Sequence, residues 1–580
     1  MRRTTTVGAM VQTDVLVIGG GGAAARAALE ARRAGAQVVL VSKGSFGAVG
    51  TRGAGATASG LSPFGIFATP RWTGPLSTAE TALAHMVSSP PERALRNILQ
   101  VGLGMADPRL ASILVEDAVE TRRALLGWGV VFGQHGIKSH GVPVMEALVR
   151  EIRSAGVSVR ERTMMAGLLV QDGECAGAIG VDETNGELVA IRAGATVIGT
   201  GGDANLFLLN LNPPCTTGDG YAMGYEAGAE LMNLEFRQIF LGTVYPTKNM
   251  ITQGLPPHVR LLNARREEFL QNYLPPATSV DECLAQRHLH NPFSTRDLLS
   301  KYVDIAMVSE VKAGRGTEHH GIYLDRRDPR IPPLPTSRAE FWLYRGIDFA
   351  HELVEVGVCH HSSLGGFRVS ENAATTLRRL YAVGEAAAGA HGADRIGGHM
   401  LLASQVFGAR AGRHAAALAR RRQHADLDDR VLRRSEERIT ALRDRNGKQK
   451  PGAVKRKLQE SAYDNLLVVK SEKSLTRLLD DVTGIHDEVL PDLSVTDAHD
   501  LVEALELRNL LVLAGIEATV CRERTESRGS HYREDFPRQD DRTWLKSVTV
   551  RQVGGEPVLG TVVLDPTWQS RDEEHVKRFG

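Results

Sequence analysis

Four consecutive glycines between a short apolar strand and a small-residue helix constrain this chain more than any other feature. Val15-Leu16-Val17-Ile18 is typical of a fully buried parallel strand, Gly19 to Gly22 follow without a spacer, and residues 23–34 have a helical pattern. A second apolar strand is predicted at Val38 to Val41, at the spacing of a β-α-β unit. The stretch therefore predicts a nucleotide-binding α/β unit near the N-terminus.

The glycine pattern has the chemistry of a pyrophosphate site. Gly19 permits the tight turn, Gly21 lets a pyrophosphate approach the backbone, and Ala24 is small enough for the helix to pack on the strand. The helix N-terminus adds unpaired N–H groups and a positive dipole. The alternative is an ordinary tight turn in a buried sheet. NAD is disfavoured, because the acid expected about 20 positions further on is replaced by Ser42-Lys43.

Length and charge set the broad class of protein. At 580 residues the chain is long enough for two to four domains, and its formal net charge of +1 provides no basic surface for nucleic acid. No apolar run approaches the ~20 residues of a membrane span, so we expect none. The first residues carry two arginines followed by polar threonines instead of an apolar signal core, which predicts a cytoplasmic protein.

The five cysteines are spread singly, with no C-x-x-C pair. This spacing argues against an iron–sulfur cluster held by this chain alone, a c-type haem attachment and an obvious zinc site. We therefore expect no metal site. If the protein moves electrons, a partner has to carry them further.

The rest of the chain divides by composition. The glycine-dense continuation after Lys43 suits a backbone lying against a flat ligand, and the alternative is a surface loop. Separate strands are predicted at 188–192 and 195–198, and the α/β pattern is expected to resume at 354–358. The predicted domains are a nucleotide-binding domain in two parts (1–230 and 354–424), an inserted domain (231–353), a helical domain (425–535) and a C-terminal extension (536–580) that contains a strand pair around Gly554-Gly555.

Several motifs along most of the chain resemble, in the same order, those of the flavoprotein subunit superfamily of succinate dehydrogenase and fumarate reductase, which includes L-aspartate oxidase. The matching blocks are Val17 to Ala24, Val41 to Gly44, Thr217 to Met223, Arg296-Asp297 with Gly314-Arg315-Gly316, Leu380 to Ala386, His391 to Gly398, Glu526 to Arg533, and Trp544-Leu545-Lys546. Ser-Lys after the second strand is that family's usual pattern with FAD.

The resemblance implies an α/β fold, with a Rossmann-like FAD-binding domain in several segments, an inserted α+β capping domain and a C-terminal helical domain. It also implies that Glu385 holds the ribose. The residues expected to line the FAD are Gly19, Gly21, Gly22, Ala23, Ala24, Ser42, Lys43, Gly44, Gly50, Thr51, Gly53, Gly201, Gly202, Asp219, Glu385, Arg395, and Leu401 or Leu402. Gly50 falls where respiratory members carry the histidine that bonds the flavin, which implies non-covalent FAD.

In the family, a hydride passes between the flavin and a carbon next to a carboxylate, and an arginine exchanges the proton on the neighbouring carbon. The resemblance assigns that proton to Arg296, and the alternative is an arginine that caps or pairs at a helix start. His361 and Arg395 match the pair that grips the substrate carboxylate, with Thr252 as a further anchor. Because His360 directly precedes His361, the family's histidine could correspond to either residue.

Two departures from the family pattern bear on the substrate. Phe240 stands where the family has a substrate-carboxylate histidine, and Gln253 stands where it has a glutamate of a proton relay. Losing a charged contact costs on the order of 1.5–3 kcal/mol, a factor of roughly ten to a hundred in affinity. Succinate, fumarate and aspartate are therefore disfavoured, and a larger substrate with one anionic end and an apolar body is predicted.

Three functional hypotheses follow, besides a flavoprotein that only binds. The first is an FAD-dependent oxidoreductase that interconverts a saturated and an unsaturated bond next to a carboxylate or similar group. The second is an aspartate-oxidase-like amine oxidase that uses oxygen or fumarate. The third is one subunit of an electron-transfer complex in which an iron–sulfur partner carries the clusters that this chain lacks.

Overall fold

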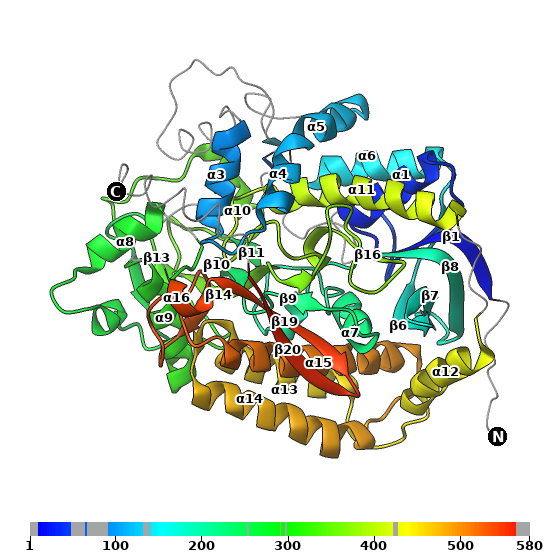
Figure 1. Ribbon diagram of the computed structural model, residues 1–580. Helices are drawn as coiled ribbons and strands as arrows, with labels where there is room; N and C mark the ends of the chain where they lie inside the picture. The colour runs from blue at the N-terminus through cyan, green and yellow to red at the C-terminus, as the bar shows by residue number, and fades with distance from the viewer. Residues whose placement is uncertain are drawn as a thin grey trace.

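The computed structural model describes residues 10–47, 64–65, 91–131, 138–139, 141–251, 255–289, 292–295, 299–421 and 427–563 (Figure 1). Six residues that the sequence analysis singled out lie outside this part of the chain. They are Gly50, Thr51, Gly53, Thr252, Gln253 and Arg296.

The largest sheet has seven strands and contains the glycine turn. Its order is β5-β2-β1-β8-β7-β6, with β16 also paired to β8. The strands are β1 (Val11–Ile18), β2 (Val38–Val41), β5 (Ser158–Arg160), β6 (Thr163–Gln171), β7 (Glu174–Asp182), β8 (Leu188–Ile198) and β16 (Leu380–Ala382). Strands β5, β2, β1, β8 and β16 pair in parallel, whereas β6, β7 and β8 form an antiparallel meander.

One strand of this sheet differs from the expectation. The segments 188–192 and 195–198 form a single strand, β8, whose pairing with β1 keeps the same register on both sides of Gly194. Its first half pairs with β7 and its second half with β16. The strand therefore joins the meander to the parallel sheet.

Three helices lie along one face of the sheet: α1 (Gly22–Arg33), α6 (Gly141–Ser154) and α11 (His399–Arg421) (Figure 1). Helices α1 and α11 approach closely, since a Cβ on Gly412 would lie 2.3 Å from the carbonyl oxygen of Ala27. Helices α3 (Pro91–Val101), α4 (Pro108–Glu116) and α5 (Ala118–Gly127) pack nearby, and α7 (Asp219–Glu226) follows the loop after β8.

A second sheet of five antiparallel strands lies beside the first, in the order β11-β10-β14-β13-β12. Its strands are β10 (Arg237–Thr243), β11 (Asn249–Met250), β12 (Arg260–Leu262), β13 (Ile322–Asp325) and β14 (Val354–Ser363), accompanied by α8 (Val280–Leu289), α9 (Lys301–Glu310) and α10 (Thr336–Leu343). The strand expected to resume the α/β pattern at 354–358 belongs to this second sheet. The chain returns to the large sheet only at β16.

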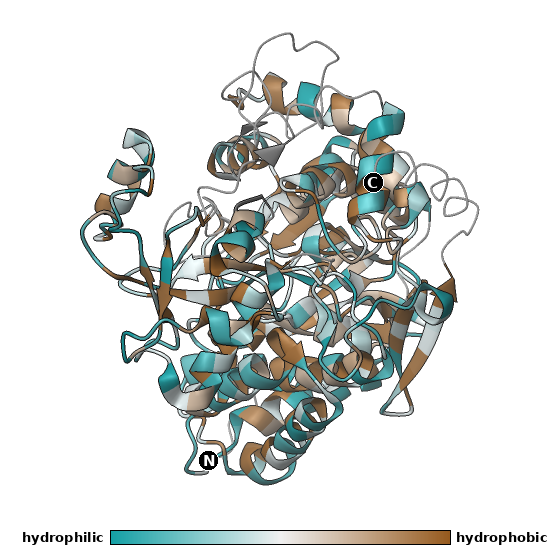
Figure 2. Ribbon diagram, turned by 90° about the vertical axis from the view of Figure 1, so that its left-hand side faces the viewer, coloured by the Kyte–Doolittle hydropathy of each residue, from teal (hydrophilic) through white to brown (hydrophobic). Residues whose placement is uncertain are grey.

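The C-terminal part consists of α12 (Asp429–Arg443), α13 (Pro451–Ala462), α14 (Glu472–Gly484) and the 26-residue α15 (Ala498–Glu523). Figure 2 shows hydrophobic and hydrophilic segments alternating along the helices, as in amphipathic helices. The second sheet shares one hydrophobic core with α13, α14 and α15, in which Val356 of β14, Leu458 of α13 and Leu507 of α15 are fully buried. The buried residues of α12 belong to a separate cluster with β6, β7 and β8. No helix in the described part of the chain is long and apolar enough to cross a membrane.

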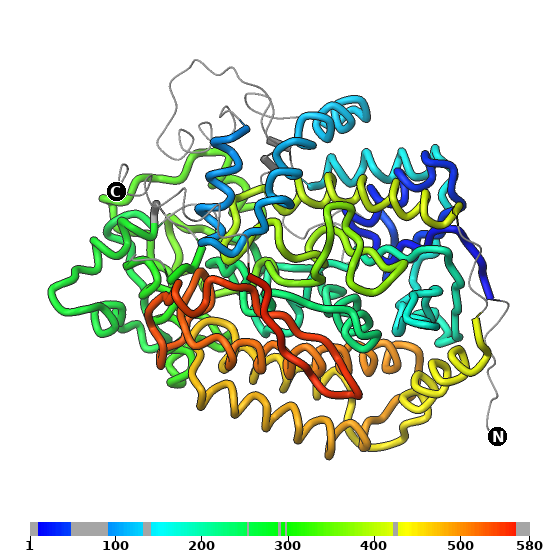
Figure 3. The backbone as a smooth tube through the Cα atoms, in the orientation of Figure 1, coloured from blue at the N-terminus to red at the C-terminus, as the bar shows by residue number. Residues whose placement is uncertain are grey.

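The predicted strand pair near the C-terminus is confirmed as the hairpin β19 (Lys546–Val553) and β20 (Glu556–Val563), which turns at Gly554-Gly555 with φ of 62° and 95°. It joins β9 (Leu231–Met232) and β15 (Gly366–Phe367) in a four-stranded sheet. Figure 3 shows this red hairpin crossing the molecule in front of the orange helices. Two short strand pairs and one short helix complete the described α-helices and β-strands: β3 (Phe64–Gly65) with β4 (Lys138–Ser139), β17 (Val469–Lys470) with β18 (Tyr532–Arg533), and α16 (Asp541–Trp544).

Candidate cofactor and active site

A cavity of about 1410 Å³, including open solvent at its mouth, extends from the glycine turn to the two predicted carboxylate anchors. Eleven of the residues singled out from the sequence line it: Gly19, Gly21, Gly22, Ala23, Lys43, Gly201, Asp219, His361, Glu385, Arg395 and Leu401. The nucleotide-binding turn and the substrate anchors therefore face one continuous space.

Other residues that were expected to line the FAD lie behind the cavity wall. Ala24 packs against Gly199, the residue that follows β8. A Cβ added to Gly199 would lie 2.8 Å from the Cβ of Ala24. Ser42 is fully buried beneath Gly20, and Leu402 is fully buried in the core, so the pair Leu401 or Leu402 contributes Leu401 to the cavity. Gly202 and Gly44 are also absent from the cavity wall.

The backbone of the glycine turn leaves room for an anion. Gly19 has φ of +127°, and a Cβ there would lie 2.2 Å from the carbonyl oxygen of Gly199, so only glycine fits. A Cβ on Gly21 would meet no described atom within 4 Å, and Gly21 lines the cavity just before α1. The turn thus offers open backbone at a helix N-terminus, which suits a pyrophosphate.

Lys43, at the end of β2, is tied to the opposite wall of the cavity. Its Nζ donates to Thr217 Oγ1 at 2.6 Å, Asp219 at 2.7 Å and Glu506 of α15 at 2.9 Å. Burial alone would lower the pKa of this lysine, but Asp219 and Glu506 outweigh burial and raise it. Lys43 therefore stays charged and ties β2, α7 and α15 together around the cavity.

Arg395 is held by a reciprocal contact with Gln238 of β10. Nη2 of Arg395 donates to Gln238 Oε1, while Nε2 of Gln238 donates to the backbone oxygen of Arg395 at 2.7 Å. Burial lowers the pKa of Arg395 to about 10, so the guanidinium remains charged at neutral pH. Its Nε is buried without a hydrogen-bond partner among the described residues, which leaves one donor for a ligand.

The structure separates the two neighbouring histidines of β14. His361 lines the cavity, whereas His360 stacks on Phe207 with ring centroids 5.2 Å apart. Burial, with additional contributions from Arg395 and His360, lowers the pKa of His361 to about 3, so this imidazole is neutral. Its Nδ1 is buried and finds no partner in the described part of the chain, so it can serve as a hydrogen-bonding group for a ligand.

Phe240 packs edge-on against His361, with ring centroids 5.1 Å apart and an interplanar angle of 83°. The phenyl ring belongs to the side of the hydrophobic core that contains β10 and β14. Phe240 is not among the residues that line the cavity, and behind His361 it places a phenyl ring where a polar group could have served as a second anchor.

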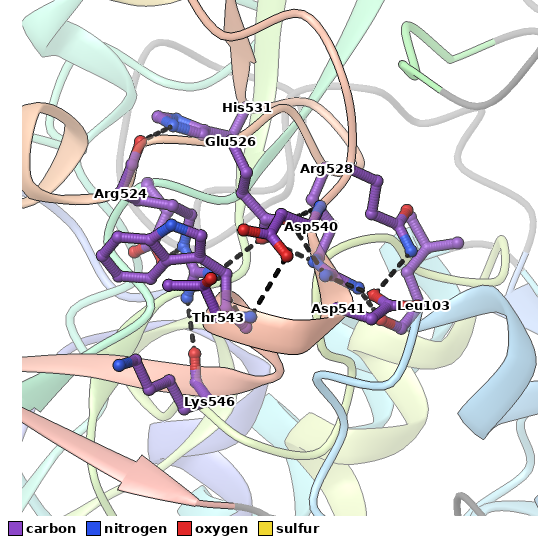
Figure 4. Close-up of polar contacts among 12 residues, drawn as sticks. Leu103, Arg524, Glu526, Arg528, His531, Asp540, Asp541, Thr543 and Lys546 are labelled. Carbon is purple, nitrogen blue, oxygen red and sulfur yellow. Dashed lines mark hydrogen bonds and ion pairs between the residues drawn. The ribbon is translucent and has the colours of Figure 1, made fainter.

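Behind these anchors lies a buried chain of ion pairs in the segment Arg524 to Lys546 (Figure 4). Arg524 pairs with Glu235 at 2.6 Å and with Glu526 at 2.8 Å, and Arg528 pairs with Glu526 at 2.7 Å, all four side chains being inaccessible to solvent. Arg528 also donates to Asp541 and to the backbone oxygen of Leu103. Because each of these charges is paired with an opposite one, the group holds the turn that follows it in a fixed position.

That turn, at Gly529-Ser530, contacts the segments that carry the anchors. The Gly529 oxygen accepts from the backbone N–H of Thr295 at 2.6 Å, one residue before Arg296 in the sequence. A Cβ on Gly529 would lie 2.3 Å from the Ala393 oxygen, two residues before Arg395. Ser530 Oγ accepts from the N–H of Arg237, next to Gln238.

Sequence reasoning missed several contributors to the cavity. Met164 and Met165 of β6, Asn212, Cys215 and Ser404 line it, and Glu506 and Gln238 position its charged residues. No local pattern marks them, because each contact joins distant parts of the chain. No group of three or more histidines, cysteines, aspartates or glutamates able to hold a metal occurs among the described residues.

Two family models match the sequence. The model described as FAD binding domain matches residues 14–141 and 133–401, and the model described as fumarate reductase flavoprotein C-term matches residues 455–569. Together they cover the large sheet, the second sheet, helices α13 to α15 and the C-terminal hairpin.

Named relatives and a solved structure match over nearly the whole chain. A fumarate reductase (CoM/CoB) subunit from Methanothermobacter marburgensis is 32% identical, covering 94% of this chain and 98% of the relative. L-aspartate oxidase of Streptomyces coelicolor is 29% identical, covering 94% and 92%. The Sdh1 complex of Mycobacterium smegmatis in its apo form contains a chain that matches with a TM-score of 0.79 and 25% identity, covering 96% and 95%.

Proposed function

The chain belongs to the superfamily of succinate dehydrogenase and fumarate reductase flavoproteins and is an FAD-dependent oxidoreductase, and from this premise we propose which reaction it performs. The enzyme interconverts a saturated and an unsaturated bond next to a carboxylate or similar group. Its substrate has one anionic end and an apolar body, and is neither succinate nor fumarate.

The residues of the cavity fit FAD. The open backbone at Gly21 suits the pyrophosphate, Glu385 presents a carboxylate that can accept from a ribose or ribityl hydroxyl, and Arg395 Nε is a buried donor still to be paired. When bound, FAD supplies hydride transfer. Gly50 has no side chain that could bond the flavin, so the cofactor is held without a covalent link.

The observation that carries the substrate proposal is the contact between Phe240 and His361. A second carboxylate at His361 would meet a neutral imidazole that is backed by a phenyl ring, whereas Arg395 provides one charged fork. A neutral or apolar group is therefore favoured at the end of the substrate that lies near Phe240.

Arg296 is the proposed carrier of the proton exchanged on the carbon next to the hydride, and Thr252 a further anchor. Support for Arg296 comes from its neighbour Thr295, whose backbone is hydrogen-bonded to the Gly529 turn close to the Arg395 segment. The two arginine-bearing segments thus share one brace.

A second candidate function is that of one subunit in an electron-transfer complex. Its support is that the five cysteines are all free and that relatives are named as subunits. An iron–sulfur partner would then exchange electrons with the cofactor of this chain. An amine oxidase is the remaining alternative, in line with the name of the Streptomyces coelicolor relative.

The decisive experiment is anaerobic and uses the FAD-loaded protein. The protein is first reduced, and the return of flavin colour is followed after adding fumarate or a monocarboxylic enoate such as crotonate or cinnamate. Oxidised protein is mixed with succinate, aspartate and the corresponding saturated monocarboxylates in the reverse experiment. We expect faster reaction with the monocarboxylates, whereas faster turnover of fumarate or succinate would refute the substrate assignment. Bleaching by aspartate with peroxide formation in air would favour the amine oxidase.

A further inference from the structure

A buried group of two acids and one arginine lies behind the cavity wall, and the proposed reaction does not use it. Asp203 follows β8, Glu517 lies on α15 and Arg237 begins β10, and none is more than 2% exposed. Ser363, at the end of β14, connects the group to the cavity: its hydroxyl donates to Asp203, and its backbone N–H donates to Glu385 Oε1 at 2.8 Å.

The close approach of these groups depends on Gly202. A Cβ there would lie 2.7 Å from Glu385 Oε1 and 2.8 Å from Ser363 Oγ, so any side chain at this position would push them apart. Glycine at position 202 thus allows the cavity glutamate to lie directly on the serine that contacts the buried acids.

Asp203 and Glu517 share one proton. Their carboxyl groups are hydrogen-bonded to each other, which two carboxyl groups can do only when one is protonated. Glu517 is the protonated member, because burial and the charge of Asp203 raise its pKa, and its second oxygen accepts from Arg237 Nη2 at 2.7 Å. Asp203 is the ionised member: burial opposes ionisation, but hydrogen bonds from Glu517 and Ser363 and the charge of Arg237 lower its pKa to about 2.

The charged groups that face Glu385 come from several elements. Burial and the negative charge of Asp203 raise its pKa, the Ser363 N–H and Arg395 lower it, and the result is about 7. Two further groups near the Glu385 carboxylate, Tyr221 and His360, add no charge to its surroundings. The hydroxyl of Tyr221 on α7 contacts the backbone oxygens of Gly365 and Glu385 and not the Glu385 carboxylate. Burial lowers the pKa of His360 to about 3, so this ring beside Ser363 is neutral.

We propose, resting on the FAD chemistry proposed above, that the Asp203–Glu517 pair sets Glu385 to take up one proton from solvent whenever the bound cofactor is reduced. Two electrons and one proton placed on the cofactor add one negative charge to the cavity. The carboxylate of Glu385 then binds a proton from water and becomes a neutral acid. Two electrons and two protons therefore enter the site together, and the reverse reaction releases both protons. Asp203 is a positioning residue: it holds Ser363 by a hydrogen bond, and its negative charge favours the protonated form of Glu385.

The proposal is tested by titrating the bound FAD with redox dyes at several pH values, because the slope of the potential gives the protons taken up per two electrons. For the wild-type protein we expect close to two protons at pH values somewhat above 7, where most of Glu385 is still ionised before the cofactor is reduced. For the double variant Asp203→Asn/Glu517→Gln, which lacks the negative charge, we expect one. Glu517→Gln alone is the matched control: its amide can donate to Asp203 and accept from Arg237, as the protonated carboxyl does, so two protons should remain.

A second variant leaves the buried pair intact, so the test does not depend on whether the double variant folds. Glu385→Gln removes the titrating group itself and should take up one proton. The proposal is overturned if the wild-type protein takes up a single proton, if Glu385→Gln still takes up two, or if Glu517→Gln alone loses the second proton. No substrate is used, so a failed search for a carboxylic acid substrate does not affect the outcome.

Discussion

Gln238 and Arg395, 157 positions apart in the chain, hold each other through two hydrogen bonds that run in opposite directions. The glutamine oxygen accepts from the guanidinium, and the glutamine N–H₂ donates to the backbone oxygen of the arginine. The same N–H₂ lies 3.3 Å from Asp394 Oδ1. Both the backbone and the charged end of the candidate carboxylate anchor are thereby fixed by one side chain on β10.

Replacing this glutamine should weaken substrate binding more than it slows chemistry. In Gln238→Ala, Arg395 loses its side-chain partner and keeps only the contact with the Ile396 backbone oxygen, so its guanidinium is held less firmly. We expect KM to rise by about ten- to a hundredfold, corresponding to roughly 1.5–3 kcal/mol. Steady-state kinetics with the best acid of the substrate panel measures this change, and flavin absorbance checks that FAD is retained. Unchanged KM would show that Arg395 is positioned by other contacts.

The residue beside His361 should control the preference between monocarboxylates and dicarboxylates. Phe240→His places a polar group at the position where the family grips a second carboxylate, so fumarate should gain relative to a monocarboxylic enoate. We expect the ratio of their kcat/KM values to shift toward fumarate by about ten- to a hundredfold. Phe240→Leu, which keeps the wall apolar, is the control and should leave the ratio close to that of the wild-type protein. Equal shifts in both variants would contradict the role of the phenyl ring.

Local patterns predicted much of the fold. The glycine turn, strand β2, helix α1 and the C-terminal hairpin lie where the sequence indicated, because each depends on residues next to one another in the chain. The sheet membership of Val354 to Ser363 could not be found in this way. A buried apolar strand has the same pattern in either sheet, and its partners β10 and β13 are set by tertiary packing.

The sequence motifs indicated residues near the candidate site, but not the residues that hold them in position. Lys43 was expected at the cofactor, but its partner Glu506 lies 463 positions away on α15, where a glutamate is an ordinary helix residue. Ala24 and Ser42 were assigned to the FAD because the motif contains them, yet both lie behind the wall, where small size permits packing. A motif therefore marks the neighbourhood of a ligand without distinguishing contact from packing.

Arg296→Gln should abolish turnover while the protein keeps its FAD. Glutamine has a similar length but cannot gain and lose a proton in the same way, so the expected loss is at least a thousandfold in kcat, on the order of 4 kcal/mol. Arg296→Lys is the conservative variant and should retain more activity at high pH. The measurement is anaerobic single-turnover kinetics with the best acid, combined with the flavin spectrum. Unchanged turnover in Arg296→Gln would exclude the assigned proton-carrying role.

Denaturation should release the flavin from the wild-type protein. Glycine at position 50 has no side chain to which the isoalloxazine could be bonded, so we expect FAD to be held only by non-covalent contacts. Yellow colour should pass through an ultrafiltration membrane after the protein is unfolded in guanidinium chloride. Flavin that remains with the unfolded chain would show that another residue forms the bond.

Breaking the buried ion pairs behind the anchors should lower the stability of the protein strongly. In Glu526→Gln, Arg524 and Arg528 lose the carboxylate that lies between them, although all three side chains are inaccessible to solvent. We expect the free energy of unfolding to fall by about 3–5 kcal/mol, because an uncompensated buried charge remains. Glu472→Gln is the matched control: Glu472 is 62% exposed and lies 3.7 Å or more from its arginine partners, so its loss should change stability by less than about 0.5 kcal/mol. Urea unfolding of both FAD-loaded variants measures the difference. The Gly529 turn contacts the segments before Arg296 and Arg395, so Glu526→Gln should also raise KM at temperatures where the protein remains folded. An unchanged KM would show that these ion pairs contribute to stability alone.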